Sequence, residues 1–200
     1  MHDVARSVLH RLCYEIHLTI FDYGGAGELH LQRSRPRHDR RTVPTLDLNR
    51  FLGHWYEIAR FDHRFERHLE AVETDYKRLP DGKIEVLNRG IDSRTGKVET
   101  ARGKAHTTDE AGRLRVSFFW FFYSDYNILE IDADYEWALI GGRSPKYLWI
   151  LARQPHLDQA TLDYILRLAQ QRGYPTGELI FVRQPAADHA TEQQIPRASI

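Results

Sequence analysis

The sequence predicts an all-β protein, an eight-stranded antiparallel up-and-down β-barrel with one C-terminal α-helix packed outside it and a short final strand. Three observations predict this fold. Short segments of alternating character follow one another from residue 53, glycine-bearing turns separate them at intervals of roughly 8 to 12 residues, and one amphipathic stretch comes only after the eighth segment. A sheet of this size that closes upon itself leaves no exposed edge, so closure is favoured over an open sheet.

Length and composition indicate one globular domain with a tail at each end. The chain has 200 residues, of which 42% are apolar and 28% are charged, and 28 basic side chains balance 28 acidic ones. A chain without net charge has no long-range attraction for polyanions, which argues against nucleic acid as a partner. No stretch approaches the roughly 18 to 20 consecutive apolar residues of a membrane helix.

The composition divides the chain into three parts. Residues 1–41 contain "YGGAG" and the basic block "RSRPRHDRR", so they are expected to form a poorly ordered leader, with a membrane-surface or partner helix near its start as the alternative. Residues 42–185 hold every predicted element, and residues 186–200 are expected to be a disordered tail. The stretch "VLHRLCYEI" around Cys13 lacks the continuous apolar segment of an export signal, so no such signal is legible.

The turns between the predicted strands carry the glycines that tight hairpins need. "PDGK" at 80–83 and "RTGK" at 94–97 are the clearest, because glycine there tolerates a positive φ. Successive hairpins pair neighbouring strands in order. The eight predicted strands are Gly53–Phe61, Ala71–Leu79, Lys83–Ile91, Lys97–Thr107, Gly112–Phe119, Asp125–Ile131, Tyr135–Gly142 and Lys146–Arg153.

The hydrophobic period changes after the eighth strand. In "LDQATLDYILRLAQQRG", Asp158 is the expected N-cap of a helix and Gly173 is its expected stop. One face of this helix is apolar, as a helix that packs on a barrel wall requires. That face consists of Leu162, Ile165, Leu166 and Ala169, and Gly177–Gln184 then predicts the short final strand.

One end of the barrel is expected to be closed by a tryptophan and an arginine. In a closed meander the first strand runs beside the eighth, which brings Trp55 near Arg153. The guanidinium would lie across the indole and bond nearby carbonyl groups, a contact worth roughly 0.5 to 2 kcal/mol. Gly53 is expected to leave room for this close approach.

Three short blocks stand out at the start of the first predicted strand, before the seventh and at the end of the eighth: Gly53 and Trp55 in "LGHWYEIARF", Asp134 and Tyr135 in "DADYEWALI", and Arg153 in "YLWILARQP". These blocks resemble the sequence motifs of the lipocalin family, and the resemblance covers approximately residues 46–185. It extends to bacterial lipocalins of the outer-membrane lipoprotein type, which are related to apolipoprotein D. It implies a barrel with a cup for a lipophilic small molecule and a place in the cell envelope, in the periplasm or at the outer membrane. Because no export signal is legible, a cytoplasmic location stays open.

Strand alternation, counted in phase with Trp55 and Arg153, predicts which side chains line the cup. An aromatic lining with scattered polar groups is typical of a pocket that holds an apolar body and a polar head. A solid core of the same rings is the alternative, and a bulge would invert the phase of a strand. The expected ligand-binding residues are Glu57, Ala59, Tyr76, Phe118, Tyr126, Trp137, Tyr147 and Trp149, with Phe61, Val72, Thr74, Leu139 and Leu151 in the same phase.

The segment "SFFWFFYSDY" concentrates aromatic rings at the turn between the fifth and sixth strands. They cannot all point inward, so they predict a mouth loop that forms a lip of the cup, a contact between two subunits of a homodimer, or a surface that touches a membrane. A loop folded down on its own barrel is the fourth alternative. The predicted mouth-loop residues are Phe119, Trp120, Phe121 and Phe122.

The motifs of common enzymes and metal sites are missing from the sequence. There is no G-x-S-x-G elbow, no glycine-rich phosphate loop and no H-E-x-x-H motif. Cys13 lies outside the domain and has no evident histidine partner for nucleophilic catalysis. The histidines of "HRFERH" at 63–68 and the carboxylates of "DADYE" at 132–136 are interpreted as solvated loop charges. We therefore expect no enzymatic activity, no cofactor and no bound metal.

The expected function is the binding and storage or transport of a lipophilic small molecule, a long-chain fatty acid or a lysophospholipid, in the maintenance of envelope lipids. Burying one methylene group yields roughly 0.8 kcal/mol. A chain of about 16 carbons then gains on the order of 12 kcal/mol before the costs of ordering, whereas micromolar affinity needs about 8 kcal/mol. A tetrapyrrole or haem ligand, and an enzyme acting on a lipid in the cup, remain the alternatives.

Overall fold

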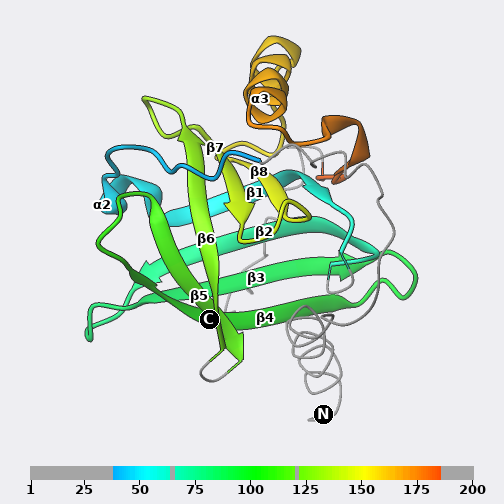
Figure 1. Ribbon diagram of the computed structural model, residues 1–200. Helices are drawn as coiled ribbons and strands as arrows, with labels where there is room; N and C mark the ends of the chain where they lie inside the picture. Colours follow the sequence, from blue (N-terminus) through cyan, green and yellow to red (C-terminus); the bar gives the residue numbers. More distant parts are fainter. Residues whose placement is uncertain (1–37, 64–65, 120–121, 186–200) are drawn as a thin grey trace, which may run out of the picture.

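The computed structural model describes residues 38–63, 66–119 and 122–185, which form a closed antiparallel barrel (Figure 1). Each strand from β2 to β8 pairs with its neighbours in chain order, and β1 pairs with both β8 and β2, which closes the barrel and confirms the predicted fold. The barrel strands are β1 (Gly53–Phe61), β2 (Leu69–Arg78), β3 (Ile84–Asp92), β4 (Val98–Thr107), β5 (Arg113–Phe119), β6 (Phe122–Ile131), β7 (Trp137–Gly142) and β8 (Leu148–Ala152).

Two strands, β6 and β7, begin at different residues from those predicted. β6 begins at Phe122 rather than Asp125, because Phe119 and Phe122 already pair across the tip of the β5–β6 hairpin. β7 begins at Trp137 rather than Tyr135. Tyr135 stands in the preceding turn with a φ of 62°, and its N–H donates to the Asp132 carbonyl at 3.0 Å.

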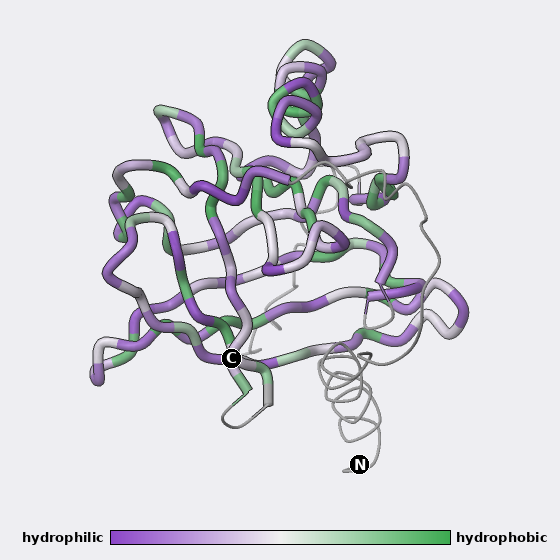
Figure 2. The backbone as a smooth tube through the Cα atoms, viewed as in Figure 1, coloured by the Kyte–Doolittle hydropathy of each residue, from purple (hydrophilic) through white to green (hydrophobic). Residues whose placement is uncertain are grey.

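Helix α3 (Gln159–Gln171) lies across the outer wall of the barrel (Figure 1). The Asp158 side chain accepts a hydrogen bond from the Thr161 N–H at 2.9 Å, which confirms the predicted N-cap. Two helix residues, Ile165 and Ala169, are fully buried against outward-facing side chains of β1, β6, β7 and β8. The β7 and β8 strands beneath it consist mostly of hydrophobic residues (Figure 2).

A bulge in β1 reverses the direction of its side chains. The pairing of β1 with β8 shifts by one residue between Glu57 and Ala59. Trp55 and Glu57 face the interior before the bulge, whereas Ala59 and Phe61 pack in the outer cluster beneath α3. The prediction that Ala59 and Phe61 line the cup is therefore wrong.

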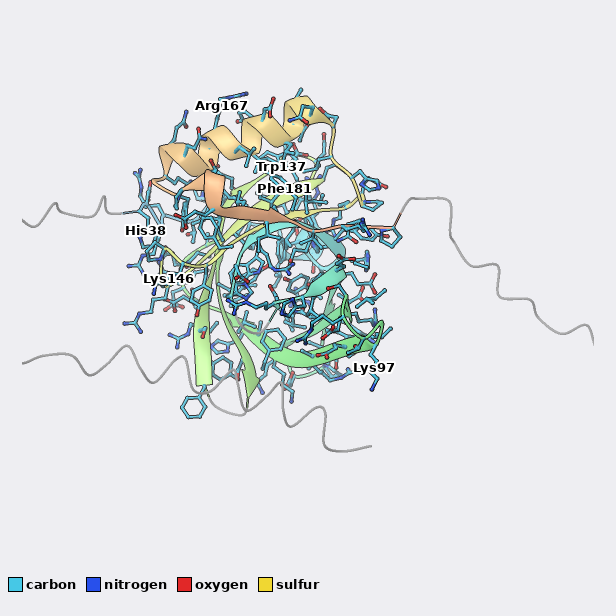
Figure 3. The ribbon with its side chains drawn as sticks, turned by 90° about the vertical axis from the view of Figure 1, so that its right-hand side faces the viewer. His38, Lys97, Trp137, Lys146, Arg167 and Phe181 are labelled. Atoms are coloured by element: carbon cyan, nitrogen blue, oxygen red, sulfur yellow. The ribbon has the colours of Figure 1, made fainter. Side chains whose placement is uncertain are left out.

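The phase predicted for β7 is also wrong. Antiparallel pairing sets Ile140 opposite the inward-facing Trp149, so the residues of β7 that face the interior are Ala138 and Ile140. Trp137 and Leu139 face outward and pack beneath α3. Figure 3 shows Trp137 under the helix, where its ring meets the Tyr164 ring edge-on at 6.0 Å.

The C-terminal part of the domain closes a gap beside β1. A short 3-10 helix, η1 (Thr176–Glu178), leads into β9 (Leu179–Phe181), which is shorter than predicted and pairs with the last three residues of β1. Farther along, the Gln184 side chain donates to the backbone carbonyls of Glu57 and Val72 at 2.7 and 2.8 Å. This segment therefore joins β1 to β2 where the two strands no longer pair directly.

The segment just before the barrel is part of the folded domain. Residues 38–41, predicted as part of the leader, already contact the folded domain: the Asp39 N–H donates to the carbonyl of Arg172 at the end of α3, and Arg40 donates to the carbonyl of Arg143 in the β7–β8 turn. Residues 1–37, which include Cys13, most of the expected leader and its alternative helix, lie outside the described residues, as does the expected tail at 186–200. In the part that is described, no helix is long and apolar enough to cross a membrane.

Arg153 and a short helix seal one end of the barrel, as the sequence predicts for Trp55 and Arg153. The guanidinium carbon lies 3.7 Å from the centre of the Trp55 ring, and the indole N–H donates to the Phe51 carbonyl at 2.8 Å. Helix α2 (Leu48–Phe51), which the sequence analysis missed although Asp47 is a recognisable N-cap, closes the floor. The carbonyl groups that accept hydrogen bonds from the Arg153 Nη atoms are those of Arg50, Phe51, Leu52 and His54.

Gly53 is required by the backbone rather than by the need for space. Its φ is +98°, a conformation that side chains disfavour. A Cβ atom at this position would stand 3.5 Å from Arg153 Nη1, which is an ordinary contact. The opposite end of the barrel, where the β1–β2, β3–β4, β5–β6 and β7–β8 connections lie, is called the mouth below.

Replacing Arg153 by alanine is expected to lower the free energy of unfolding by roughly 2 to 4 kcal/mol, because the floor carbonyls lose their donor and Trp55 loses its stacked cation. Urea unfolding followed by tryptophan fluorescence measures the loss. Arg78→Ala is the matched control, since the exposed Arg78 makes a single side-chain hydrogen bond to Asn49 and its loss should cost less than about 0.5 kcal/mol. Equal losses in both variants would contradict a sealing role for Arg153.

Candidate ligand-binding site

The interior of the barrel is sealed at the floor and less completely buried above it. Trp55, Leu114 and Ile128 face inward near the floor and are at most 1% exposed. Phe118, Tyr126 and Trp149 pack on the same interior cluster but are partly exposed. Their partial exposure distinguishes the upper half of the interior from the fully buried floor.

An aromatic wall borders this space on the β8 side. The Tyr147 and Trp149 rings are stacked, with centroids 5.9 Å apart and planes 11° from parallel. Tyr147 stands over Gly142, where a Cβ atom would come within 2.7 Å of the Tyr147 Cβ. Tyr147 and Trp149 thus share a phase with the inward-facing Leu151, and their role in ligand binding stays a prediction.

The opposite wall, on β3 and β4, carries small side chains. Strand pairing places Gly90, Ala101 and Gly103 on the inward face, in phase with the buried Val86 and Ala105. Gly103 lies under the Phe118 ring, whose Cδ1 atom would be 2.8 Å from an added Cβ. Large rings on one wall and small residues on the other give the cup its width.

A buried ionic cluster of Glu57, Arg60, His63 and Glu66 adjoins the aromatic wall. All four residues are 8% exposed or less. Arg60 donates to Glu57 Oε1 at 2.6 Å and to the backbone carbonyls of Glu66 and Leu69 at 2.7 and 3.0 Å. These bonds hold the β1–β2 connection against β1.

The Glu66 carboxylate joins this cluster to β8. Its Oε2 atom accepts a hydrogen bond from the Trp149 indole N–H at 3.1 Å and lies 3.1 Å from His63 Nε2. The interpretation of His63 as a solvated loop charge is therefore wrong, whereas His68 is exposed as expected. Of the four cluster residues only Glu57 was predicted to face the cup, because the others depend on the bulge and on a loop that folds inward.

The pKa values of the two carboxyl groups in the cluster are shifted in opposite directions. Burial, together with the nearby Glu66 charge, raises the pKa of Glu57 well above its ordinary value, although Arg60 opposes this. Burial also acts to raise the pKa of Glu66, but His63, Arg60 and the Trp149 indole outweigh it and lower that pKa. The cluster thus favours one protonated and one ionised carboxyl group beside a single guanidinium.

Tyrosine hydroxyls and an asparagine supply further polar groups in the cup. The Tyr76 and Tyr126 hydroxyls are 2.6 Å apart, and burial raises the pKa of both phenols, so both stay neutral. Asn88 faces inward opposite Thr74, and its Oδ1 atom is buried without a hydrogen-bond partner among the described residues. Counting in twos from Val86 would have found Asn88, which the sequence analysis overlooked.

The remaining predicted residues lie at the two ends of the barrel. At the mouth, Phe119 ends β5 and Phe122 begins β6, whereas Trp120 and Phe121 lie outside the described residues. At the floor, the exposed Asp134 occupies the β6–β7 turn, but it is Asp132 that accepts hydrogen bonds from the backbone there. In the described ranges, no group of three or more His, Cys, Asp or Glu side chains is arranged to hold a metal ion.

The protonated state of Glu57 predicts how stability changes with pH. The unfolded chain releases this proton above a pH of about 4.3, while the folded protein retains it to higher pH. The contribution of protonated Glu57 to the free energy of unfolding therefore declines as pH rises from about 4.3 through the raised pKa. Glu57→Gln keeps a neutral acceptor for Arg60, and its advantage over the native protein should grow by up to about 1.4 kcal/mol per pH unit in that window. Urea unfolding between pH 5 and 8 measures this difference; a constant or shrinking difference would contradict protonation of Glu57.

Comparison with known proteins agrees with the fold and the motifs. Residues 46–184 match the family model described as a lipocalin-like domain. The chain is 41% identical over 147 residues to the outer membrane lipoprotein Blc of Vibrio cholerae, a match that covers 72% of this chain and 86% of the relative. It is 33% identical over 129 residues to apolipoprotein D of Macaca fascicularis, covering 60% of this chain and 67% of that protein.

The fold also agrees with solved structures. Insecticyanin from the tobacco hornworm Manduca sexta superposes with a TM-score of 0.61 at 20% identity, covering 74% of this chain and 86% of insecticyanin. Identity at this level supports the shared fold alone, whereas the family match spans the whole barrel and the bacterial relative is far closer in sequence. The Arg153–Trp55 contact at the floor, the closed meander and these matches together show that the chain belongs to the lipocalin family.

Proposed function

We propose that the protein binds a long-chain fatty acid or a lysophospholipid in the barrel and stores or carries it within the cell envelope. The observation that carries this proposal is the set of partly exposed aromatic rings on the interior face of the barrel, above a sealed apolar floor. An acyl chain buried there gains roughly 0.8 kcal/mol for each methylene group removed from water. The envelope location is supported by the outer-membrane lipoprotein relative.

The ionic cluster favours one orientation of the ligand. The Arg60 guanidinium is already engaged by Glu57 and two backbone carbonyls, so it offers little to an anionic head group. A buried anion beside the ionised Glu66 would add the cost of desolvation to that of like-charge repulsion. The acyl chain therefore points to the floor and the head group stays at the mouth, where Figure 3 shows Lys97 and Lys146 on opposite sides.

Asn88 favours a lysophospholipid over a simple fatty acid. Its buried Oδ1 atom can accept a hydrogen bond but finds no donor in the described protein. The glycerol part of a lysophospholipid carries a hydroxyl that can donate, whereas an ionised fatty acid carries acceptors only. Satisfying a buried acceptor contributes about 1 to 3 kcal/mol, enough to separate the two ligand classes.

Ala101→Phe tests where the ligand lies, because it places a ring on the inward face of β4, in the upper interior where the ligand is proposed to lie. Lysophospholipid affinity, measured by quenching of tryptophan fluorescence, should fall about tenfold or more, which corresponds to at least 1.4 kcal/mol. Thr100→Phe is the matched control: it adds the same ring to the next residue of β4, on the outer face, and should leave affinity within about twofold. Similar losses in both variants would place the ligand outside the barrel.

Asn88→Leu tests the choice between the two ligand classes. The variant should bind a lysophospholipid about tenfold more weakly, while its affinity for a fatty acid of equal chain length changes by less than about twofold. Parallel titrations of both ligands measure the two constants. Equal changes would remove the role of Asn88, whereas an unmodified protein that binds neither ligand would refute the proposed function itself.

A further inference from the structure

A second concave site lies on the outer wall of the barrel and is separate from the cup. It is a hollow of about 600 Å³ bordered by β5, β6, the β4–β5 turn and the β7–β8 turn. Its lining is dominated by four arginines, Arg40, Arg113, Arg115 and Arg143. Neither the cup nor its proposed ligand involves any of these residues.

Strand alternation and the N-terminal segment bring the four arginines together. Leu114 faces the interior of the barrel, so its neighbours Arg113 and Arg115 face outward on β5. Arg143 stands in the β7–β8 turn. Arg40 reaches it from the segment that precedes the barrel and donates a hydrogen bond to the Arg143 carbonyl at 3.1 Å. Four guanidinium groups from three separate parts of the chain thus surround one hollow.

Two of the arginines are paired with carboxylates, and two are not. Arg113 Nη1 lies 2.6 Å from Glu110 Oε2, and Arg115 Nη1 lies 3.6 Å from Asp125 Oδ1. Arg40 and Arg143 form no ion pair with any residue that the structure describes, and both are exposed. With Asp109 as the third carboxylate of the lining, the hollow keeps one positive charge in excess.

Arg115 has donor capacity that the protein does not use. Its Nη2 atom donates to the Tyr123 carbonyl at 3.0 Å, and Asp125 is too distant for a hydrogen bond. Its Nε atom is buried and meets no acceptor in the described residues. A buried N–H without an acceptor costs about 1 to 3 kcal/mol, a cost that an oxyanion bound in the hollow would remove.

The surrounding wall reinforces the attraction for anions. His106 pairs with Arg115 across the β4–β5 ladder, and Lys104 faces the same side of β4. Guanidinium groups present planar forks of N–H donors that match the oxygens of a phosphate group. A phosphate group carries a charge of about −1.5 to −2 at pH 7, so several guanidinium groups around one hollow suit it better than they suit a single carboxylate.

We propose that this outer hollow binds a phosphate group, with Arg115 and Arg143 as its principal ligands. The group belongs either to a small soluble phosphate compound or to the head group of a phospholipid at a membrane surface, since both present the same oxygens. The site would give the protein a second contact with envelope components, independent of the molecule held in the cup.

The test uses the full chain, with inorganic phosphate as one probe and vesicles of phosphatidylcholine containing phosphatidic acid as the other. Chemical shifts of the arginine Nε–H groups report on phosphate, and co-sedimentation reports on vesicles. We expect Arg115→Gln combined with Arg143→Gln to weaken binding of the preferred probe about tenfold. The single variant Arg143→Gln, at an exposed turn position, should weaken it about threefold and serves if the double variant does not fold.

Arg102→Gln is the matched control. Arg102 faces outward on β4 and pairs with Glu85, so the variant removes one positive charge from the same wall without altering the hollow. Saturable binding of inorganic phosphate alone, or of the vesicles as well, supports the proposal and identifies the soluble or the lipid source. Absence of binding to both probes, or an equal loss in Arg102→Gln, would overturn it.

Discussion

The stack of Arg153 on Trp55 is the contact on which the rest of the molecule depends. It joins the end of β8 to the start of β1 and holds the carbonyl groups of α2, so that the two ends of the meander and the floor are secured by one side chain. Because this end is sealed, a molecule cannot enter the interior through the floor. Above this floor, large aromatic side chains pack on the interior cluster without being fully buried.

The buried charged side chains of the interior are paired with one another or with the backbone. Arg60 is shared between Glu57 and the backbone of the β1–β2 connection, and the Glu66 carboxylate is bound by Trp149 and His63. Such a cluster is costly to bury unless every member is paired. Its position on one wall leaves the remainder of the interior apolar, as the proposed acyl-chain ligand requires. Alternation along the strands separates this interior from a strongly charged exterior. One strand, β5, therefore contributes apolar side chains to the cup and arginines to the outer hollow.

Much of the fold follows from local patterns, and the errors share one origin. The bounds of β1, the Asp158 cap and the contact of Trp55 with Arg153 were all predictable, because turn glycines, capping residues and an antiparallel closure act over short distances or through topology. Ala59, Phe61 and Trp137 were assigned to the wrong face. A bulge and the pairing register of β7 with β8 decide these directions, and neither leaves a signal in the order of residues.

The sequence by itself therefore determined which segments become strands, where the helix begins, and which end of the barrel is closed. The tertiary structure alone decided which side chains share the interior, that His63 and Glu66 fold inward to meet Trp149, and that Arg40 joins three other arginines outside. The physical reason is the difference in range. Turn and cap preferences are set by neighbouring residues, whereas the partner of a buried charge and the face of a strand depend on hydrogen-bond registers between segments far apart in the chain.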